Sequence, residues 1–290
     1  MLRLVLPKGS LEKATLELFE AADLAVVRSS SVDYRASIDD PRIVEVRILR
    51  PQEIPVYVAE GLFDFGITGR DWVEETASDV HSLGELKYSK ATTNPVRVVV
   101  AVDGNSPAQR AEDLPNGVRV TSEYPEMTKR FFAEKGIEAD VRLSYGASEA
   151  KIPDIADCVV DITETGRALK AAGLRIIDTI LTSYTELVAN KQAWADPAKR
   201  HAMEQIHTLL NGTLEARGQV LVKLNVSEAN FEKVLAVLPS AKSPTVSRLA
   251  SGDYAVESVV QKRTINTVIP ALKDAGATDL LELPISKIIH

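Results

Sequence analysis

Residues 159–169 combine residue types that suit a bound sugar phosphate. The β-branched start is typical of a buried strand, and the end, from Arg167 onward, is rich in good helix formers. Between them, Asp161 could accept hydrogen bonds from ribose hydroxyls, and Gly166 would let a phosphate approach the free N–H groups of the helix start. The pattern predicts a phosphoribosyl ligand, but it is also typical of an ordinary strand–helix turn capped by Thr165.

Two other predicted strand ends carry residues that suit nucleotide or phosphate binding. Lys8 follows an apolar strand over residues 2–6, and we expect Ser10 to cap the helix after it. A strand over residues 63–68 runs into an acid, Asp71, at the start of another helix. Because ligands gather at the carboxyl ends of strands in open α/β sheets, these ends predict a ligand cleft. Lys8 by itself also fits a solvated surface lysine.

Composition and charge exclude several classes of protein. The chain has 290 residues and a formal charge of −7, which argues against a general nucleic-acid binder. Cys158 is the only cysteine, so neither an internal disulfide nor a cysteine-based metal site is possible. The four histidines are scattered, and no apolar run is long enough to cross a membrane. Met1 leads directly into a strand without a signal-peptide core, so we expect a cytoplasmic protein.

Strands and helices alternate along most of the chain, a pattern typical of parallel sheets covered by helices. We expect Pro51 to occupy the first position of one helix, and residues 106–114 to form a short capped helix. Residues 30–42 are polar and irregular. After residue 217 the expected order becomes β-α-β-β-α-β, the ferredoxin-like unit.

This alternation divides the chain into three predicted domains. Residues 1–93 and 183–216 would form a first lobe, residues 94–182 a second lobe, and residues 217–290 a separate domain. We expect the chain to cross between the lobes at Asn94–Pro95 and Thr182–Ser183.

Five stretches, in this order, resemble the motifs of one enzyme family. They are Leu6-Pro7-Lys8-Gly9, Ile54-Pro55-Val56-Tyr57-Val58, Asp64-Phe65-Gly66-Ile67-Thr68-Gly69-Arg70-Asp71, Asp161-Ile162-Thr163-Glu164-Thr165-Gly166 and Ser243-Pro244-Thr245. Each is a weak signal alone. Their order and the chain length resemble the long form of ATP phosphoribosyltransferase, the first enzyme of histidine biosynthesis, over essentially the whole sequence.

The resemblance implies a fold, a reaction and partners. The fold would be an α/β protein with a two-lobed, periplasmic-binding-protein-like catalytic core and a C-terminal ferredoxin-like (ACT-like) domain that binds histidine as a regulator. In the reaction, N1 of the ATP adenine would displace pyrophosphate from 5-phosphoribosyl 1-diphosphate, with Mg²⁺ on the diphosphate. The partners would be these two substrates, histidine as inhibitor, and further copies of the chain in a dimer or hexamer, with no nucleic acid or membrane.

The resemblance also assigns site residues by their position in the motifs. The phosphoribosyl-binding residues would be Asp161, Thr163, Glu164, Thr165, Gly166, Arg167 and Ala168. ATP or its phosphates would contact Lys8, Gly9, Arg50 and Asp71, and histidine would contact Asn225, Ser243, Thr245 and Ala277. Glu149 and Lys151 would border the cleft. Ala168 departs from the hydroxyl residue usual in the family, so we expect weaker phosphoribosyl binding without loss of activity.

Two other functions fit part of the sequence. A small-molecule binding module of the periplasmic type would share the two lobes, but it would normally carry an export signal and would not explain a sugar-phosphate turn. A phosphoribosyltransferase acting on a free base would carry two adjacent acids before Thr-Gly, whereas here Ile162 follows Asp161. The sequence does not identify a general base, and adenine N1 already has a lone pair.

Overall fold

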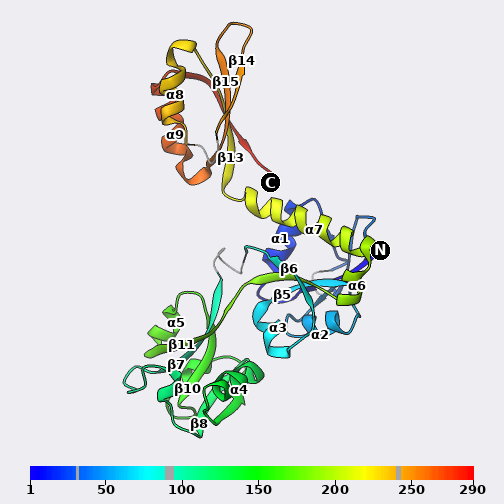
Figure 1. Ribbon diagram of the computed structural model, residues 1–290, viewed down its shortest axis with the longest axis vertical. Helices are drawn as coiled ribbons and strands as arrows, with labels where there is room; N and C mark the ends of the chain where they lie inside the picture. Colours follow the sequence, from blue (N-terminus) through cyan, green and yellow to red (C-terminus); the bar gives the residue numbers. More distant parts are fainter. Residues whose placement is uncertain (31–32, 89–94, 240–242) are drawn as a thin grey trace. The chain divides into compact units, whose positions relative to one another are not determined.

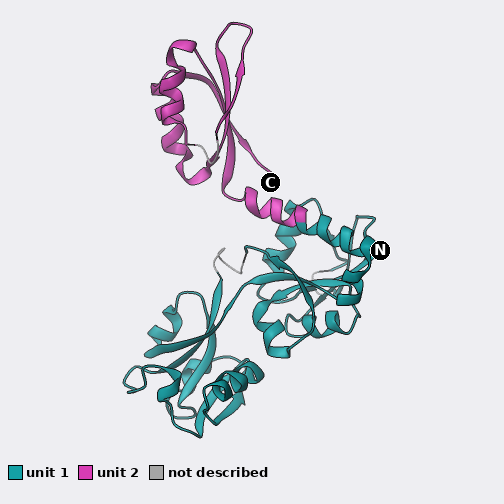
Figure 2. Cartoon of the chain, viewed as in Figure 1, with its two compact units in different colours: residues 1–207 teal, residues 208–290 magenta. Residues whose placement is uncertain are grey.

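The computed structural model describes residues 1–30, 33–88, 95–239 and 243–290 (Figure 1). These residues form two compact units, 1–207 and 208–290, which Figure 2 shows in different colours. The boundary falls inside the long helix α7 (Pro197–Ala216), whereas the sequence places it after Ala216. The second half of α7 belongs with the C-terminal residues, because the Ile288 N–H donates to the Gly212 carbonyl at 2.9 Å.

The first sheet gathers strands from both ends of the first unit, in the order β2-β3-β4-β1-β5-β12-β6. Its strands are β1 (Leu2–Pro7), β2 (Val26–Val27), β3 (Arg35–Ile38), β4 (Ile43–Leu49), β5 (Phe65–Gly69), β6 (His81–Glu85) and β12 (Thr185–Ala189). The central strands β4, β1 and β5 are parallel, and β12 is antiparallel to both β5 and β6. The first lobe is this sheet with α1 (Glu12–Ala21), α2 (Ile54–Ala59), α3 (Arg70–Thr76) and α6 (Lys191–Ala195).

The second lobe is built on a five-stranded sheet of order β11-β7-β10-β8-β9, which is mixed and not wholly parallel as predicted, because β7 is antiparallel to both β10 and β11. It comprises β7 (Val96–Asp103), β8 (Val118–Ser122), α4 (Pro125–Glu134), β9 (Ala139–Leu143), β10 (Cys158–Thr163), α5 (Arg167–Ala171) and β11 (Leu174–Ser183). Its core contains buried valines of β7 and β10 together with Phe132 of α4. The chain returns to the first lobe through a single residue, Tyr184, between β11 and β12. The other predicted crossing between the lobes is at Asn94–Pro95, and Asn94 lies outside the described residues.

The second unit is an antiparallel sheet of order β14-β15-β13-β16 with two helices. Its elements are β13 (Gln219–Val226), α8 (Phe231–Val237), β14 (Thr245–Arg248), β15 (Tyr254–Gln261), α9 (Ile265–Asp274) and β16 (Ala277–Pro284). Even-numbered residues of β13, from Val220 to Val226, are buried in a core with residues of α8 and α9, and Figure 1 shows both helices along one face of the sheet. This order confirms the predicted ferredoxin-like arrangement.

Three predicted helix starts are wrong. α1 begins after Leu11 and not after Ser10, because the Glu12 side chain instead accepts from the Gly9 N–H at 3.3 Å. α2 begins at Ile54, with Pro55 in its first turn, since Pro51 lies in the preceding turn and its carbonyl accepts from the Thr68 hydroxyl. Gly166, and not Thr165, is the N-cap of α5, as described below.

Two further stretches differ from the prediction. In residues 106–114 only Ala111–Asp113 is helical, as one 3₁₀ turn. The Arg175 guanidinium donates hydrogen bonds to the carbonyls of Ser106 and Ala108 at 2.9 and 2.8 Å, so these carbonyls do not accept from helical N–H groups. Residues 30–42 include strand β3, whose polar pattern reflects an exposed position near the sheet edge. Within the described residues, no helix is long and apolar enough to span a membrane.

Candidate active site

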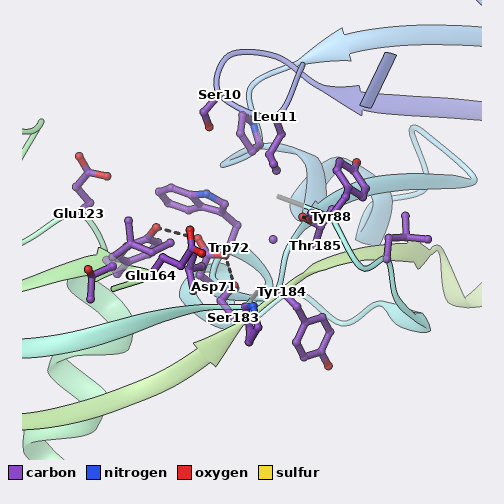
Figure 3. Close-up of a pocket in the computed structure, with 18 of the residues that line it drawn as sticks. Ser10, Leu11, Asp71, Trp72, Tyr88, Glu123, Glu164, Ser183, Tyr184 and Thr185 are labelled. Carbon is purple, nitrogen blue, oxygen red and sulfur yellow. Dashed lines mark hydrogen bonds between the residues drawn. The ribbon is translucent and has the colours of Figure 1, made fainter. Parts of the chain in front are cut away.

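A pocket of about 390 Å³ lies in the first unit and is lined by residues of both lobes (Figure 3). The carboxyl ends of β5, β8 and β10 each supply part of its lining, as expected for an α/β ligand site. Its residues are Ser10, Leu11, Pro51, Gln52, Gly69, Asp71, Trp72, Glu85, Leu86, Tyr88, Pro95, Val96, Glu123, Tyr124, Ile162, Thr163, Glu164, Ser183, Tyr184 and Thr185.

Asp71 joins the two lobes at this pocket. It is only 4% exposed, and its carboxylate accepts from the Ser183 hydroxyl at 2.5 Å and the Tyr124 hydroxyl at 2.8 Å. Burial raises the pKa of Asp71, although the two hydroxyls favour its charged form. A side chain at Gly69 would place its Cβ 2.2 Å from the Asp71 Oδ1 atom, so this carboxylate position requires glycine there.

A second set of contacts connects α3 of the first lobe to α4 of the second. The Glu75 carboxylate accepts from the backbone N–H groups of Glu126 and Met127 at 3.0 and 2.8 Å. These N–H groups lie in the first turn of α4, where the helix itself offers no acceptor. The rings of Trp72 and Tyr124 also pack together, with centroids 4.7 Å apart. Hydrogen bonds and an aromatic contact therefore connect the two lobes next to the pocket.

The turn after β10 has the form that its sequence predicts, with a different cap. The Thr163 hydroxyl oxygen accepts from the Gly166 N–H at 2.8 Å. Gly166 has a φ of +74°, in the left-handed region, and a Cβ there would lie 3.3 Å from Ile176. Thr165 is exposed and does not cap the helix. A glycine is needed because the chain must turn sharply at this point.

The Asp161 and Glu123 side chains are partly buried and lie near other acidic groups. Burial raises the pKa of Asp161, and the charge of Glu149 raises it further. Burial likewise raises the pKa of Glu123. The negative charges of Asp161 and Asp71 raise this pKa further, whereas the positive charge of Lys151 lowers it. The Asp161 carboxylate accepts from the Ile162 N–H at 2.7 Å. Glu149 and Lys151 thus act on the site through their charge, although neither lines the pocket.

The remaining predicted substrate residues lie at the ends of β1 and β4, in β10 and in the turn and helix that follow β10. Lys8 stacks on Tyr34, with its Nζ 4.1 Å from the ring centroid, and Gly9 follows with a φ of +89°. Arg50 is exposed at the end of β4. Of the predicted residues, Asp71, Thr163 and Glu164 line the pocket themselves. Those that do not line it are Lys8, Gly9, Arg50, Asp161, Thr165, Gly166, Arg167 and Ala168.

Sequence reasoning missed five residues that shape the site: Trp72, Glu75, Glu123, Tyr124 and Ser183. Glu123 and Tyr124 directly follow β8, so the rule that ligands gather at strand ends could have found them. No local signal marks Glu75 or Ser183, since their partners lie 51 and 112 residues away. In the described part of the chain, no group of three or more His, Cys, Asp or Glu residues is placed to hold a metal ion.

In the second unit, the predicted histidine contacts do not all share one pocket. Ser243 and Thr245 line a pocket of about 410 Å³ on the sheet. Asn225 lies further along β13, where its amide donates to the Asp279 carboxylate at 2.9 Å. Ala277 is 4% exposed and belongs to the core, so it could offer a ligand only its backbone.

The fold and the pocket define a two-lobed α/β protein with an added ferredoxin-like unit. Residues 50–212 match the family described as ATP phosphoribosyltransferase, and residues 216–287 match the one described as HisG, C-terminal domain. The chain belongs to the ATP phosphoribosyltransferase family, in its long form, and is a transferase. The resemblance found in the five motifs is confirmed.

Relatives of similar length support this assignment. An ATP phosphoribosyltransferase of Pelotomaculum thermopropionicum is 47% identical over 290 residues, with 99% of each chain covered. One of Desulforudis audaxviator is 44% identical over 291 residues, again with 99% of each covered. A solved structure, the ATP phosphoribosyl transferase (HisG:HisZ) complex from Thermotoga maritima, is 26% identical with a TM-score of 0.63. That match covers 74% of this chain and 99% of the other.

Proposed function

We propose that this enzyme condenses ATP with 5-phosphoribosyl 1-diphosphate to give N1-(5-phosphoribosyl)-ATP and pyrophosphate, the first step of histidine biosynthesis in the cytoplasm. The observation that carries the proposal is one pocket lined by residues of two family motifs, Asp71 from the first lobe and Thr163 and Glu164 from the second. A volume of about 390 Å³ is within the range of small-molecule sites.

The proposed mechanism is a direct displacement without a covalent enzyme intermediate. The turn from Thr163 to Ala168 would hold the 5-phosphate, and Asp161 would accept from the ribose hydroxyls. Lys8, Gly9 and Arg50, at the ends of β1 and β4, would contact the ATP phosphates. Asp71 would keep the lobes in place around the adenine through Ser183 and Tyr124. The rate enhancement would come from positioning and charge stabilisation.

Mg²⁺ would enter with the diphosphate substrate and would not be a resident ion. The described residues offer no three-ligand cluster of His, Cys, Asp and Glu, and Mg²⁺ commonly keeps its waters and binds substrate phosphates. Its role would be to neutralise charge on the leaving pyrophosphate. Activity should therefore require added Mg²⁺ and stop when EDTA removes it.

One assay separates this function from its alternatives. Pyrophosphate release is measured with 5-phosphoribosyl 1-diphosphate and either ATP or free purine and pyrimidine bases, with the nucleotide product identified by mass. We expect release with ATP alone. Release only with a free base would indicate a salvage enzyme, and no release with binding of a small ligand would indicate a binding module.

The second unit would regulate the enzyme by binding histidine, in an assembly of several copies of this chain. Support comes from its match to the C-terminal domain of the family and from the pocket that contains Ser243 and Thr245. Inhibition at a distance requires histidine to bind one state of the enzyme better than another. A chain that ends at Ala216 should keep transferase activity and lose inhibition. Inhibition with an unchanged midpoint would place the sensor in the first unit.

A further inference from the structure

The pocket described above has an acidic lining. Its charged residues among those described are Asp71, Glu85, Glu123 and Glu164, and none is lysine or arginine. Carboxylates repel phosphate, but they stabilise a positive charge. In the proposed reaction, such a charge develops on the adenine as its N1 forms a bond to carbon, and on the ribose ring as the diphosphate leaves. The pocket therefore fits the reacting centre better than it fits the phosphates.

Glu123 is the carboxyl best placed to respond to this charge. Asp71 already accepts from Ser183 and Tyr124, and Glu85 is exposed to solvent. Glu123 is only partly exposed, and within the described chain its carboxylate has no hydrogen bond or ion pair. In the view of Figure 3, it lies at the left edge of the labelled residues, and Trp72 lies between it and Tyr88.

The neighbours of Glu123 suit a purine. The next residue, Tyr124, is buried and packs its ring against that of Trp72, with centroids 4.7 Å apart, and the partly exposed Trp72 lines the pocket. Aromatic rings stack on nucleic-acid bases, and such stacking contributes about 1–3 kcal/mol per base. Glu123 directly follows β8 and lines the same pocket, so an adenine bound against Trp72 would share the pocket with its carboxyl group.

We propose that Glu123 is a catalytic residue that accepts a hydrogen bond from the exocyclic amino group of adenine during attack by N1. This inference rests on the proposed function. The N1 lone pair forms the bond to C1 of the ribose, and the C1–O bond breaks with its electron pair leaving on pyrophosphate. The adenine then carries one positive charge, shared by N1 and the exocyclic nitrogen. The Glu123 carboxylate keeps its hydrogen bond to that nitrogen and so stabilises this charge.

The surroundings of Glu123 match this role. A charge that appears only in the transition state is stabilised most by a fixed, partly desolvated partner, and loss of one such group typically lowers kcat by about 10²–10³-fold. Burial, Asp161 and Asp71 raise the pKa of Glu123, which makes its carboxylate a stronger hydrogen-bond acceptor. Because only the ionised form can accept, kcat should fall as the pH drops through this raised pKa.

The test compares the full-length enzyme with Glu123→Gln and Glu123→Asp, and with Glu134→Gln as a matched control on the exposed end of α4. We expect Glu123→Gln to lower kcat about 100-fold with little change in the KM for 5-phosphoribosyl 1-diphosphate, and to remove the acidic limb of the pH profile. Glu123→Asp should recover part of kcat, and Glu134→Gln should equal the wild type.

A substrate change keeps the test independent of folding defects. Purine riboside triphosphate lacks the exocyclic amino group, so the wild type should be slow on it and Glu123→Gln should cause no further loss. An equal loss on both substrates, or wild-type kcat and an unchanged pH profile in Glu123→Gln, would overturn the role of Glu123. Absence of product from the wild type with ATP would instead refute the proposed function.

Discussion

Replacing Glu75 by alanine tests whether α3 of one lobe caps α4 of the other. The change removes a carboxylate that accepts two backbone N–H groups, from Glu126 and Met127, at 3.0 and 2.8 Å. Loss of an N-cap side chain costs about 0.5–2 kcal/mol, and loss of a negative charge at a helix start costs about 0.3–1 kcal/mol. Because the contact is partly exposed, we expect a combined loss of about 1–2 kcal/mol of unfolding free energy.

Thermal and urea unfolding measure this loss directly. For a unit of this size, about 1 kcal/mol corresponds to roughly 2–4 °C, so the melting temperature should fall by about 2–8 °C. The control is Glu134→Ala, which removes a carboxylate at the opposite, C-terminal end of α4 and should be neutral or slightly stabilising. Equal stability of the two variants, or a loss below about 0.3 kcal/mol in Glu75→Ala, would show that this cap does not hold the lobes together.

Three further predictions concern the turn after β10, Asp161 within that strand, and the first sheet. Gly166→Val should weaken binding of the phosphoribosyl substrate about tenfold or more, because φ is +74° there; an unchanged KM would remove this turn from the site. Asp161→Ala should lower kcat/KM about ten- to a hundredfold, whereas a lower melting temperature with normal kinetics would show a purely structural role. Asp64→Asn should destabilise the enzyme at neutral pH but not in acid. Burial raises the pKa of Asp64, but hydrogen bonds from Arg3 and Lys199 lower it further than burial raises it. The contribution of Asp64 to stability is therefore present above about pH 4 and is lost as the pH falls through the folded-state pKa. A stability difference from wild type that persists at low pH would contradict this.

The sequence predicts those parts of the fold that depend on regular patterns. Alternation of strands and helices locates most elements, and the β-α-β-β-α-β order identifies the second unit because each element is coded by its own local periodicity. The turn after β10 is likewise local, since the Gly166 N–H donates to the Thr163 hydroxyl three residues before it. Such features can be predicted without knowing what packs around them.

Features that depend on distant partners escape prediction. The bond between Asp71 and Ser183 spans 112 residues, and nothing beside Ser183 in the sequence indicates it. Residues 106–114 have a helix-like composition, but Arg175 donates to two carbonyls that would accept from backbone N–H groups in a helix. Tertiary contacts override local preference at these places, and several of them lie at the site itself.

The position of β12 in the first sheet affects how this chain can fold as it is made. β12 lies between β5 and β6, yet residues 185–189 leave the ribosome only after the whole second lobe. The second lobe is one continuous segment, residues 96–183, and can complete its sheet first. Until β12 arrives, one edge of β5, a strand buried along its full length in the finished protein, has no partner. A nascent or truncated chain that stops before Thr185 would therefore expose an apolar, unpaired edge and would be prone to aggregation.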